Sequence, residues 1–246
     1  MNRVTLPLRL SDTLRSWFST GTLLLVSAST LAAVDAGPAM APRMDFTPLP
    51  AGTYQLPAIQ SVQDAGLVDE RGRHVRLGSV TTGKITLLTF FYTYCVDPLG
   101  CPFARETLSA LRDRLMADRN LARAVRFVGI SCDPTTDTPE VLAPYARVFT
   151  RGSKFEWRFL TAPTVPALLP VLDDLGQDVS VDIDEQGRPT RTLHHMLKVF
   201  LIDPRGVVRE IYSLAFIQPD VIMNDIRTLY LESETQSALN SPDRPR

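Results

Sequence analysis

The sequence predicts an α/β fold in which a central mixed sheet is flanked by helices. Three apolar stretches, at residues 85–92, 126–132 and 199–202, predict strands of which both faces are covered. Amphipathic stretches of helical period follow the first two of these stretches and the end of the third, so strands and helices alternate along the chain. The 246 residues are enough for one well-buried domain with extensions.

The first half of the expected domain begins with a half-exposed hairpin. Its strands lie within residues 62–68 and 74–77, and the residues Asp-Glu-Arg-Gly at 69–72 form its turn. The strand at 85–92 then leads into a helix that begins near Pro102, because proline costs little in the first helical turn.

The second half continues the alternation. Residues 138–149 begin with Thr-Pro-Glu, the order that a helix start prefers, and residues 165–175 form a helical run interrupted by Pro170. The strand at 199–202 forms a hairpin with residues 207–212, and a last amphipathic helix covers 219–231. This order is that of the thioredoxin fold, with an added N-terminal hairpin and an insertion before the last hairpin.

The two ends of the chain differ in composition from the domain, which we place at residues 56–232. Three arginines precede an apolar run at 21–34 and a small-x-small site at 34–36, so residues 1–36 have the layout of a secretory signal peptide. An uncleaved membrane anchor is the alternative, although the run is short for a spanning helix. Residues 37–55 form a proline-rich linker, and 233–246 a polar, disordered tail. We therefore expect an exported, periplasmic protein that contacts the membrane only through such an anchor.

Charge and cysteine content narrow the function. The formal net charge of −1 argues against a nucleic-acid partner, which usually requires a basic face. The three cysteines, Cys95, Cys101 and Cys132, are an odd number for an oxidising compartment and do not make a disulfide framework. They are better explained as reactive or metal-binding groups.

Cys95 and Cys101 lie between a central strand and the start of a helix. The N–H groups and the dipole of a helix start stabilise a thiolate, which is both the nucleophile and the metal ligand. Five residues separate the two cysteines, more than in the C-x-x-C redox pair. The sulfurs can close on a metal or form a disulfide, and the spacing alone does not decide between these.

The chain resembles the SCO/SenC family of copper chaperones in three ordered segments. The first is FFYTYC at residues 90–95 with Cys101-Pro102, and the second is ISCDP at 130–134 with the residues DTPEVL at 137–142. The third is His195 with FLIDPRG at 200–206. The resemblance runs from about residue 55 to residue 231, nearly the whole expected domain.

The resemblance implies a thioredoxin fold and one copper ion, Cu(I) or Cu(II), held by Cys95, Cys101 and His195. Family members deliver copper to the oxidase subunit that houses a binuclear copper centre, or act there as thiol reductants. The implied partners are thus a copper-receiving oxidase subunit and a thiol-redox partner. Two thiolates and one imidazole suit Cu(I) and tolerate Cu(II).

This chain departs from the family pattern in three places. Five residues instead of three separate the cysteines, His194 replaces an aspartate before the histidine, and Cys132 replaces an aliphatic residue. Neighbouring side chains in an extended segment point to opposite faces, so we expect His195 to face the cysteines and His194 to lie at the surface. Cys132 is expected in the core, with a resolving thiol as the alternative.

The sequence is compatible with two functions of different classes. The first is a metallochaperone that binds copper and is not a turnover enzyme. The second is a periplasmic thiol–disulfide oxidoreductase that uses Cys95 and Cys101 as catalytic groups without copper. The two hypotheses differ in whether His195 is needed, because thiol exchange requires only the two cysteines.

Overall fold

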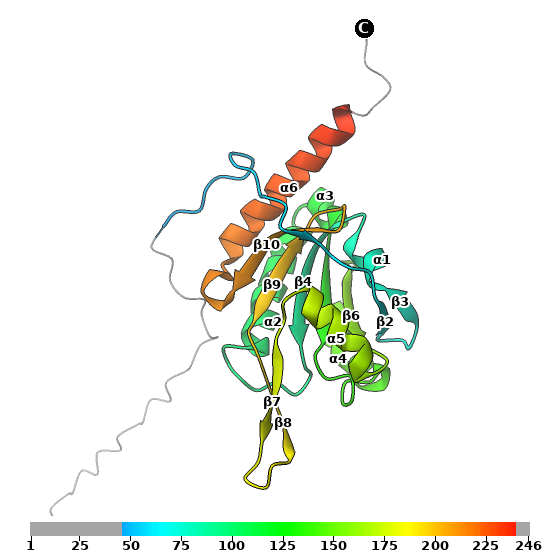
Figure 1. Ribbon diagram of the computed structural model, residues 1–246. Coiled ribbons are helices and arrows are strands. Elements are labelled where there is room, and N and C mark those ends of the chain that lie inside the picture. The colour runs from blue at the N-terminus through cyan, green and yellow to red at the C-terminus, as the bar shows by residue number, and fades with distance from the viewer. Residues whose placement is uncertain (1–45, 240–246) are drawn as a thin grey trace, which may run out of the picture. The chain divides into compact units, whose positions relative to one another are not determined.

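The computed structural model describes residues 46–239, in which an eight-stranded mixed sheet is covered by helices on both faces (Figure 1). The strand order is β1-β10-β9-β4-β5-β6-β2-β3. This confirms the predicted α/β, thioredoxin-like class. The predicted signal peptide over residues 1–36 lies outside the described residues, as does the first part of the predicted linker.

The three buried strands predicted from the sequence are β4 (Ile85–Phe91), β5 (Val125–Ser131) and β9 (Lys198–Ile202), which are neighbours at the centre of the sheet. Strands β4, β5 and β6 (Trp157–Thr161) are parallel, and β9 runs antiparallel to β4. The remaining strands of this sheet are antiparallel: β10 (Val207–Ser213), β1 (Gln60–Ser61), β2 (Gly66–Asp69) and β3 (His74–Arg76). Every residue of β4 and β5 is buried, which explains why these strands lack polar alternation.

The helices form two layers. Side chains of β4 alternate between the layers, with Leu87 and Phe91 on one face and Leu88 and Phe90 on the other. The first face packs against α2 (Cys101–Met116), α3 (Arg119–Ala124), α4 (Pro139–Thr150) and α6 (Pro219–Leu239). The second packs against α1 (Leu77–Thr81) and α5 (Val165–Asp174). A 3-10 turn at Leu214–Phe216 precedes α6.

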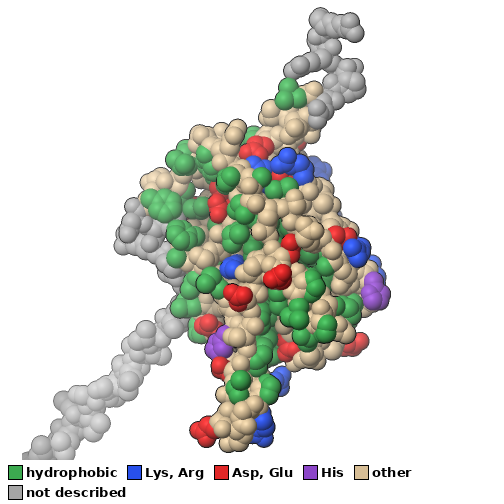
Figure 2. Space-filling view, in the orientation of Figure 1, with side chains coloured by type: hydrophobic (Ala, Val, Ile, Leu, Met, Phe, Trp, Pro, Cys, Tyr) green, Lys and Arg blue, Asp and Glu red, His purple; other side chains and the backbone are tan. Residues whose placement is uncertain are grey.

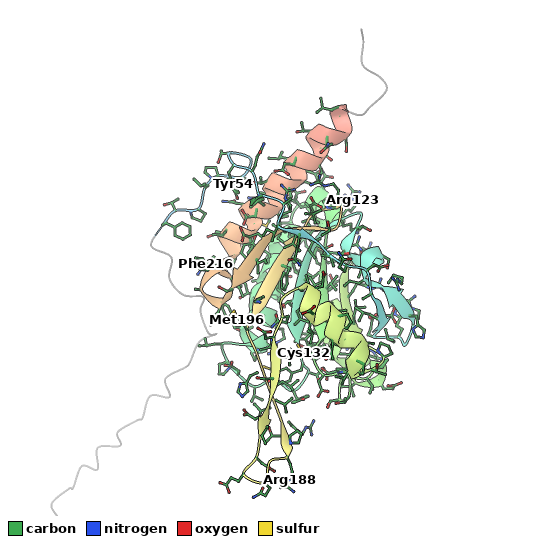
Figure 3. The ribbon with its side chains drawn as sticks, in the orientation of Figure 1. Tyr54, Arg123, Cys132, Arg188, Met196 and Phe216 are labelled. Atoms are coloured by element: carbon green, nitrogen blue, oxygen red, sulfur yellow. The ribbon has the colours of Figure 1, made fainter. Side chains whose placement is uncertain are left out.

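The insertion before the last hairpin is itself a two-stranded hairpin, β7 (Val179–Ile183) and β8 (Pro189–His195). It extends beyond the sheet, and Arg188 lies at its tip (Figures 1 and 3). The sequence predicts no strands here, because most of these residues are exposed and lack the apolar pattern of a core strand.

The ends of the domain also differ from the sequence prediction. Helix α6 continues to Leu239, so residues 233–239, expected to be disordered, are helical. The hydroxyls of Thr235 and Ser237 donate to carbonyls one turn earlier, which places these polar side chains along the helix itself.

The end of the predicted linker contacts the domain. The Gly52 amide donates to the Thr228 hydroxyl, the Tyr54 hydroxyl donates to Asp225, and Leu56 is buried. We call residues 49–57 the N-terminal strap. Within residues 46–239, no helix has both the length and the apolar character needed to cross a membrane.

Candidate metal and thiol site

The two cysteines of the predicted site flank one loop between β4 and α2. Cys101 is the first residue of α2 and is buried, whereas Cys95 is half-buried. The Cys95 amide donates to the Tyr92 carbonyl and the Gly100 amide to the Asp97 carbonyl, so the longer loop consists of two consecutive tight turns. The extra residues are therefore accommodated without moving Cys101 from the helix start.

The two thiols differ in acidity. The pKa of Cys95 is lowered to about 5, first because the Cys101 thiol donates a hydrogen bond to it. The backbone N–H of Cys101, the Tyr92 hydroxyl and the backbone N–H of Asp97 lower it further, against the opposing effect of burial. The pKa of Cys101 is raised, because its proton is held in that hydrogen bond and its sulfur is buried. At neutral pH the pair therefore consists of one thiolate and one thiol, which is the pattern of an activated cysteine.

His195 ends β8 and comes to this pair from the hairpin. Its Nε2 lies 3.9 Å from the Cys101 Sγ, and its Nδ1 is buried without a hydrogen-bond partner among the described residues. Burial lowers the pKa of this imidazole, which keeps it neutral and leaves a nitrogen lone pair available. The structure thus places His195 beside the cysteines, while its role as a ligand stays a prediction.

An open cavity of about 580 Å³ gives access to this site. Cys95 and His195 line it together with the residues Tyr92, Val96, Asp97, Gly100, Asp178, Ser180, Thr192, Leu193, His194 and Met196. Within residues 46–239, no group of three His, Cys, Asp or Glu side chains already stands in metal-binding arrangement. The donors therefore form two adjoining pairs, Cys95 with Cys101 and Cys101 with His195.

Two tyrosines, Tyr92 and Tyr94, join the inserted hairpin to the cysteine loop. The Tyr92 hydroxyl donates to the Leu193 carbonyl at 3.1 Å. The Arg191 guanidinium lies 4.9 Å from the centre of the Tyr94 ring, and the Tyr94 hydroxyl donates to Asp133 at 2.6 Å. A tyrosine that follows a buried strand carries a hydroxyl that needs a partner, which is the signal available in the sequence.

Asp137 is a further positioning residue, and its role is not evident from the sequence pattern. It is fully buried, and it accepts hydrogen bonds from the Thr93 amide and hydroxyl and from the Ser131 hydroxyl. Burial raises the pKa of this carboxyl. These bonds fix the end of β4 against the end of β5, and so fix the start of the loop that holds Cys95.

Cys132 lies just after β5, with 7% of its surface exposed. Its amide donates to the Phe91 carbonyl, and burial raises the pKa of its thiol. All three cysteines are free thiols. This surrounding matches the expectation of a core residue, and the resolving-thiol alternative stays untested.

His194 is exposed, and its Nε2 lies 2.7 Å from Asp182 Oδ1 on the facing strand. Its neighbour His195 is half-buried, as the alternation of side chains along an extended segment predicts. The surface position expected for His194 is therefore what the structure has.

Several solved structures have a similar fold. The chain aligns with copper-bound ScoI of Arabidopsis thaliana at 20% identity and a TM-score of 0.58, over 69% of this chain and 98% of that one. The copper-bound ScoI of Bradyrhizobium japonicum aligns at 24% identity and 0.55, over 69% and 98%. A SCO1/SenC family lipoprotein from Bacillus anthracis aligns at 24% and 0.56, over 70% and 95%.

Comparison at the level of sequence gives the family. No curated protein sequence is detectably similar to the chain. The family model described as SCO1/SenC matches residues 58–231, which is most of the chain and nearly all of the domain. The chain therefore belongs to the SCO1/SenC family.

Proposed function

We propose that this chain is an exported, periplasmic copper-binding protein that holds one copper ion through Cys95, Cys101 and His195. It delivers this copper to a respiratory oxidase subunit, or keeps the cysteines of that subunit's copper site reduced. Family membership supports copper binding and an oxidase client in general terms. The individual residues and the export are proposals for this chain.

The proposal rests on the proximity of the Cys101 and His195 side chains. Their side chains come from a helix start and from the inserted hairpin, 94 residues apart in sequence, and lie 3.9 Å apart. The buried Nδ1 of His195 has no partner in residues 46–239. A buried polar atom without a partner is costly, and a function explains why it is kept.

The donor set fits copper as cargo. Thiolate sulfur is a soft ligand that favours Cu(I), and neutral imidazole accepts either copper oxidation state. Cys95 is already a thiolate at neutral pH, whereas Cys101 must release its proton when it becomes a ligand. The open cavity allows a receiving protein to bring its own ligands to the ion, so transfer proceeds by ligand exchange.

The test is an anaerobic titration of the reduced protein with Cu(I) and with Cu(II), on the wild type and on the His195→Ala variant. We expect one tightly bound equivalent and a Cu(II)–thiolate absorption band that the variant loses. The variant His74→Ala is the matched control, because His74 is exposed on β3, in a different part of the sheet. A protein that binds no copper, or that binds it unchanged after His195→Ala, would exclude the proposed site.

The thiol–disulfide oxidoreductase is the second candidate, and the unequal acidity of Cys95 and Cys101 favours it. A thiolate beside a protonated thiol is the arrangement in which one cysteine attacks a disulfide and the other resolves the mixed disulfide. This activity needs neither copper nor His195. Thiol exchange that survives His195→Ala at full rate, in a protein that binds no copper, would favour this function over the first.

A further inference from the structure

Two donor side chains at the rim of the cavity are not used by the proposed site. His194 and Met196 line the same cavity as Cys95 and His195, and both are exposed. Met196 is 63% exposed, although methionine is usually a buried residue in soluble proteins. An imidazole and a thioether thus stand at the entrance of a cavity that the Cys95 thiol also lines.

The two side chains lie on either side of His195 in the sequence. Exposure alternates along this segment, with His194 exposed, His195 half-buried, Met196 exposed and Leu197 buried. Residues two apart in an extended segment share a face, so His194 and Met196 are presented together while His195 points inward. Figure 3 places Met196 where the hairpin joins the body of the domain.

The His194 ring is held by a carboxylate. Its Nε2 lies 2.7 Å from Asp182 Oδ1, and Ser180, two residues before Asp182, is the cross-strand partner of His194. An Nε2–H that donates to a carboxylate leaves the Nδ1 lone pair free, which is how metal-binding histidines are commonly oriented. Figure 2 shows a histidine beside an acidic side chain at the surface where the hairpin begins.

The backbone at Met196 is held by the side chain of Gln177. Gln177 is 2% exposed, and its Nε2 donates to the Met196 carbonyl at 3.1 Å and to the Asp178 carbonyl at 3.3 Å. These bonds join the two ends of the hairpin. The backbone that carries the exposed thioether is therefore already anchored. Less conformational entropy is lost when the thioether binds a ligand.

We propose that His194 and Met196 form an outer Cu(I) site at the rim of the cavity, with Asp182 orienting the His194 ring. The thioether favours Cu(I), because Cu(II) and Zn(II) bind harder donors more readily. Its purpose rests on the proposed function, since the outer site would pass copper inward to Cys95, Cys101 and His195. Copper keeps its oxidation state in that step: bonds to His194 and Met196 break, bonds to the inner donors form, and the Cys101 proton goes to solvent.

The test isolates the outer site by removing the inner thiols. The variant Cys95→Ser/Cys101→Ser is titrated anaerobically with Cu(I) in competition with a coloured Cu(I) chelator. We expect it to retain one equivalent. Adding His194→Ala or Met196→Leu should weaken that equivalent at least tenfold, and Asp182→Asn should weaken it about tenfold, the usual effect of losing a partner of a ligating histidine. Cys132 is present in every variant and cancels from the comparison.

Matched controls are available on the same chain. His74 is exposed on β3, and Met116, at the end of α2, is 39% exposed. The variants His74→Ala and Met116→Leu, made in the same thiol-free background, should leave the retained equivalent unchanged. Equal losses in the control and test variants would overturn the proposal.

A direct measurement covers the case in which the double serine variant does not fold. Selenomethionine-labelled protein with intact thiols is loaded with two equivalents of Cu(I), and copper X-ray absorption is recorded. A selenium neighbour of copper that disappears in Met196→Leu and persists in Met116→Leu supports the outer site. If the labelled protein without either substitution shows no selenium neighbour, the outer site is overturned. Loss of the outer equivalent with the inner one intact refutes only this inference, whereas loss of the inner equivalent alone refutes the proposed function.

Discussion

The Tyr92 hydroxyl donates a hydrogen bond of 3.1 Å to the Leu193 carbonyl, and this bond joins the cysteine loop to the strand that carries His195. The two segments otherwise belong to different parts of the fold, since Tyr92 follows the central strand β4 and Leu193 lies in the inserted hairpin. The distance between His195 and Cys101 therefore depends on a contact that neither residue makes.

Tyr92→Phe removes this bond and keeps the ring. One neutral hydrogen bond contributes about 0.5–1.5 kcal/mol, so we expect copper affinity to fall about two- to tenfold. Faster hydrogen exchange of the β7–β8 amides should accompany the loss. Tyr230→Phe on α6 is the control, and an unchanged affinity and exchange rate in Tyr92→Phe would show that the hairpin is positioned by other contacts.

The reactivity of Cys95 in the metal-free protein should follow its lowered pKa. Its alkylation rate is expected to rise with pH around a midpoint near 5, because the thiolate is the reacting form. Cys101→Ala removes the first cause of the shift and should move the midpoint upward. Since the pKa of Cys95 in the folded protein lies below the ordinary thiol value of 9.0, this thiolate stabilises the fold fully above pH 9.0, and the contribution is lost as pH falls through about 5. A midpoint near that of an ordinary thiol would contradict the described hydrogen bonding.

The strap should depend on a buried carboxylate in α6. Tyr212 is 2% exposed, and its hydroxyl donates to Asp225 at 2.6 Å, while Tyr54 of the strap donates to the other oxygen. Tyr212→Phe leaves Asp225 with one donor fewer in a buried place, so we expect the free energy of unfolding to fall by about 1–3 kcal/mol. Thermal unfolding measures this. A melting temperature equal to that of the Tyr230→Phe control would mean that water replaces the lost donor.

Gly129 in β5 provides a packing test under the site. A Cβ at this position would lie 3.0 Å from Cε1 and 3.2 Å from Cδ1 of Phe91, whose ring stacks on Tyr145 at a centroid distance of 5.2 Å. Overpacking of this kind costs about 1–3 kcal/mol, and we expect Gly129→Ala to be destabilised by that amount. Because Phe91 ends β4, copper affinity should fall as well. Adding Phe91→Leu should restore part of the stability, and a double variant as unstable as the sum of both single variants would refute the proposed clash.

The central strands are predictable because burial on both faces produces a simple apolar pattern in the sequence. The residues of β4 and β5 are buried on both faces, so nearly every position is apolar. The hairpin β7–β8 has no such apolar pattern. Its residues are mostly exposed, and it is held through Tyr92 and Arg191, whose partners are distant in sequence or depend on the tertiary fold.

The candidate site was predictable in part for the same reason. A strand followed by two cysteines and a helix start indicates an activated thiol pair from local pattern alone. The placement of His195 came from the family resemblance, and the structure has it beside Cys101. Asp137 could not be predicted, because its partners Thr93 and Ser131 meet it only once β4 and β5 are paired.

The N-terminal strap runs along the length of the domain. Strand β9 runs antiparallel to β4, so the turn after β9 lies at the end of the sheet opposite Cys95. At that turn the buried Arg209 bonds both Asp203 and the Leu56 carbonyl, which holds the end of the strap there. The start of the strap lies nearer the other end, because the Leu49 carbonyl accepts a hydrogen bond from Asn224 in the second turn of α6, the helix that follows β10. The strap therefore ties the first part of the last helix to the turn after β9, so one short segment couples both ends of the domain.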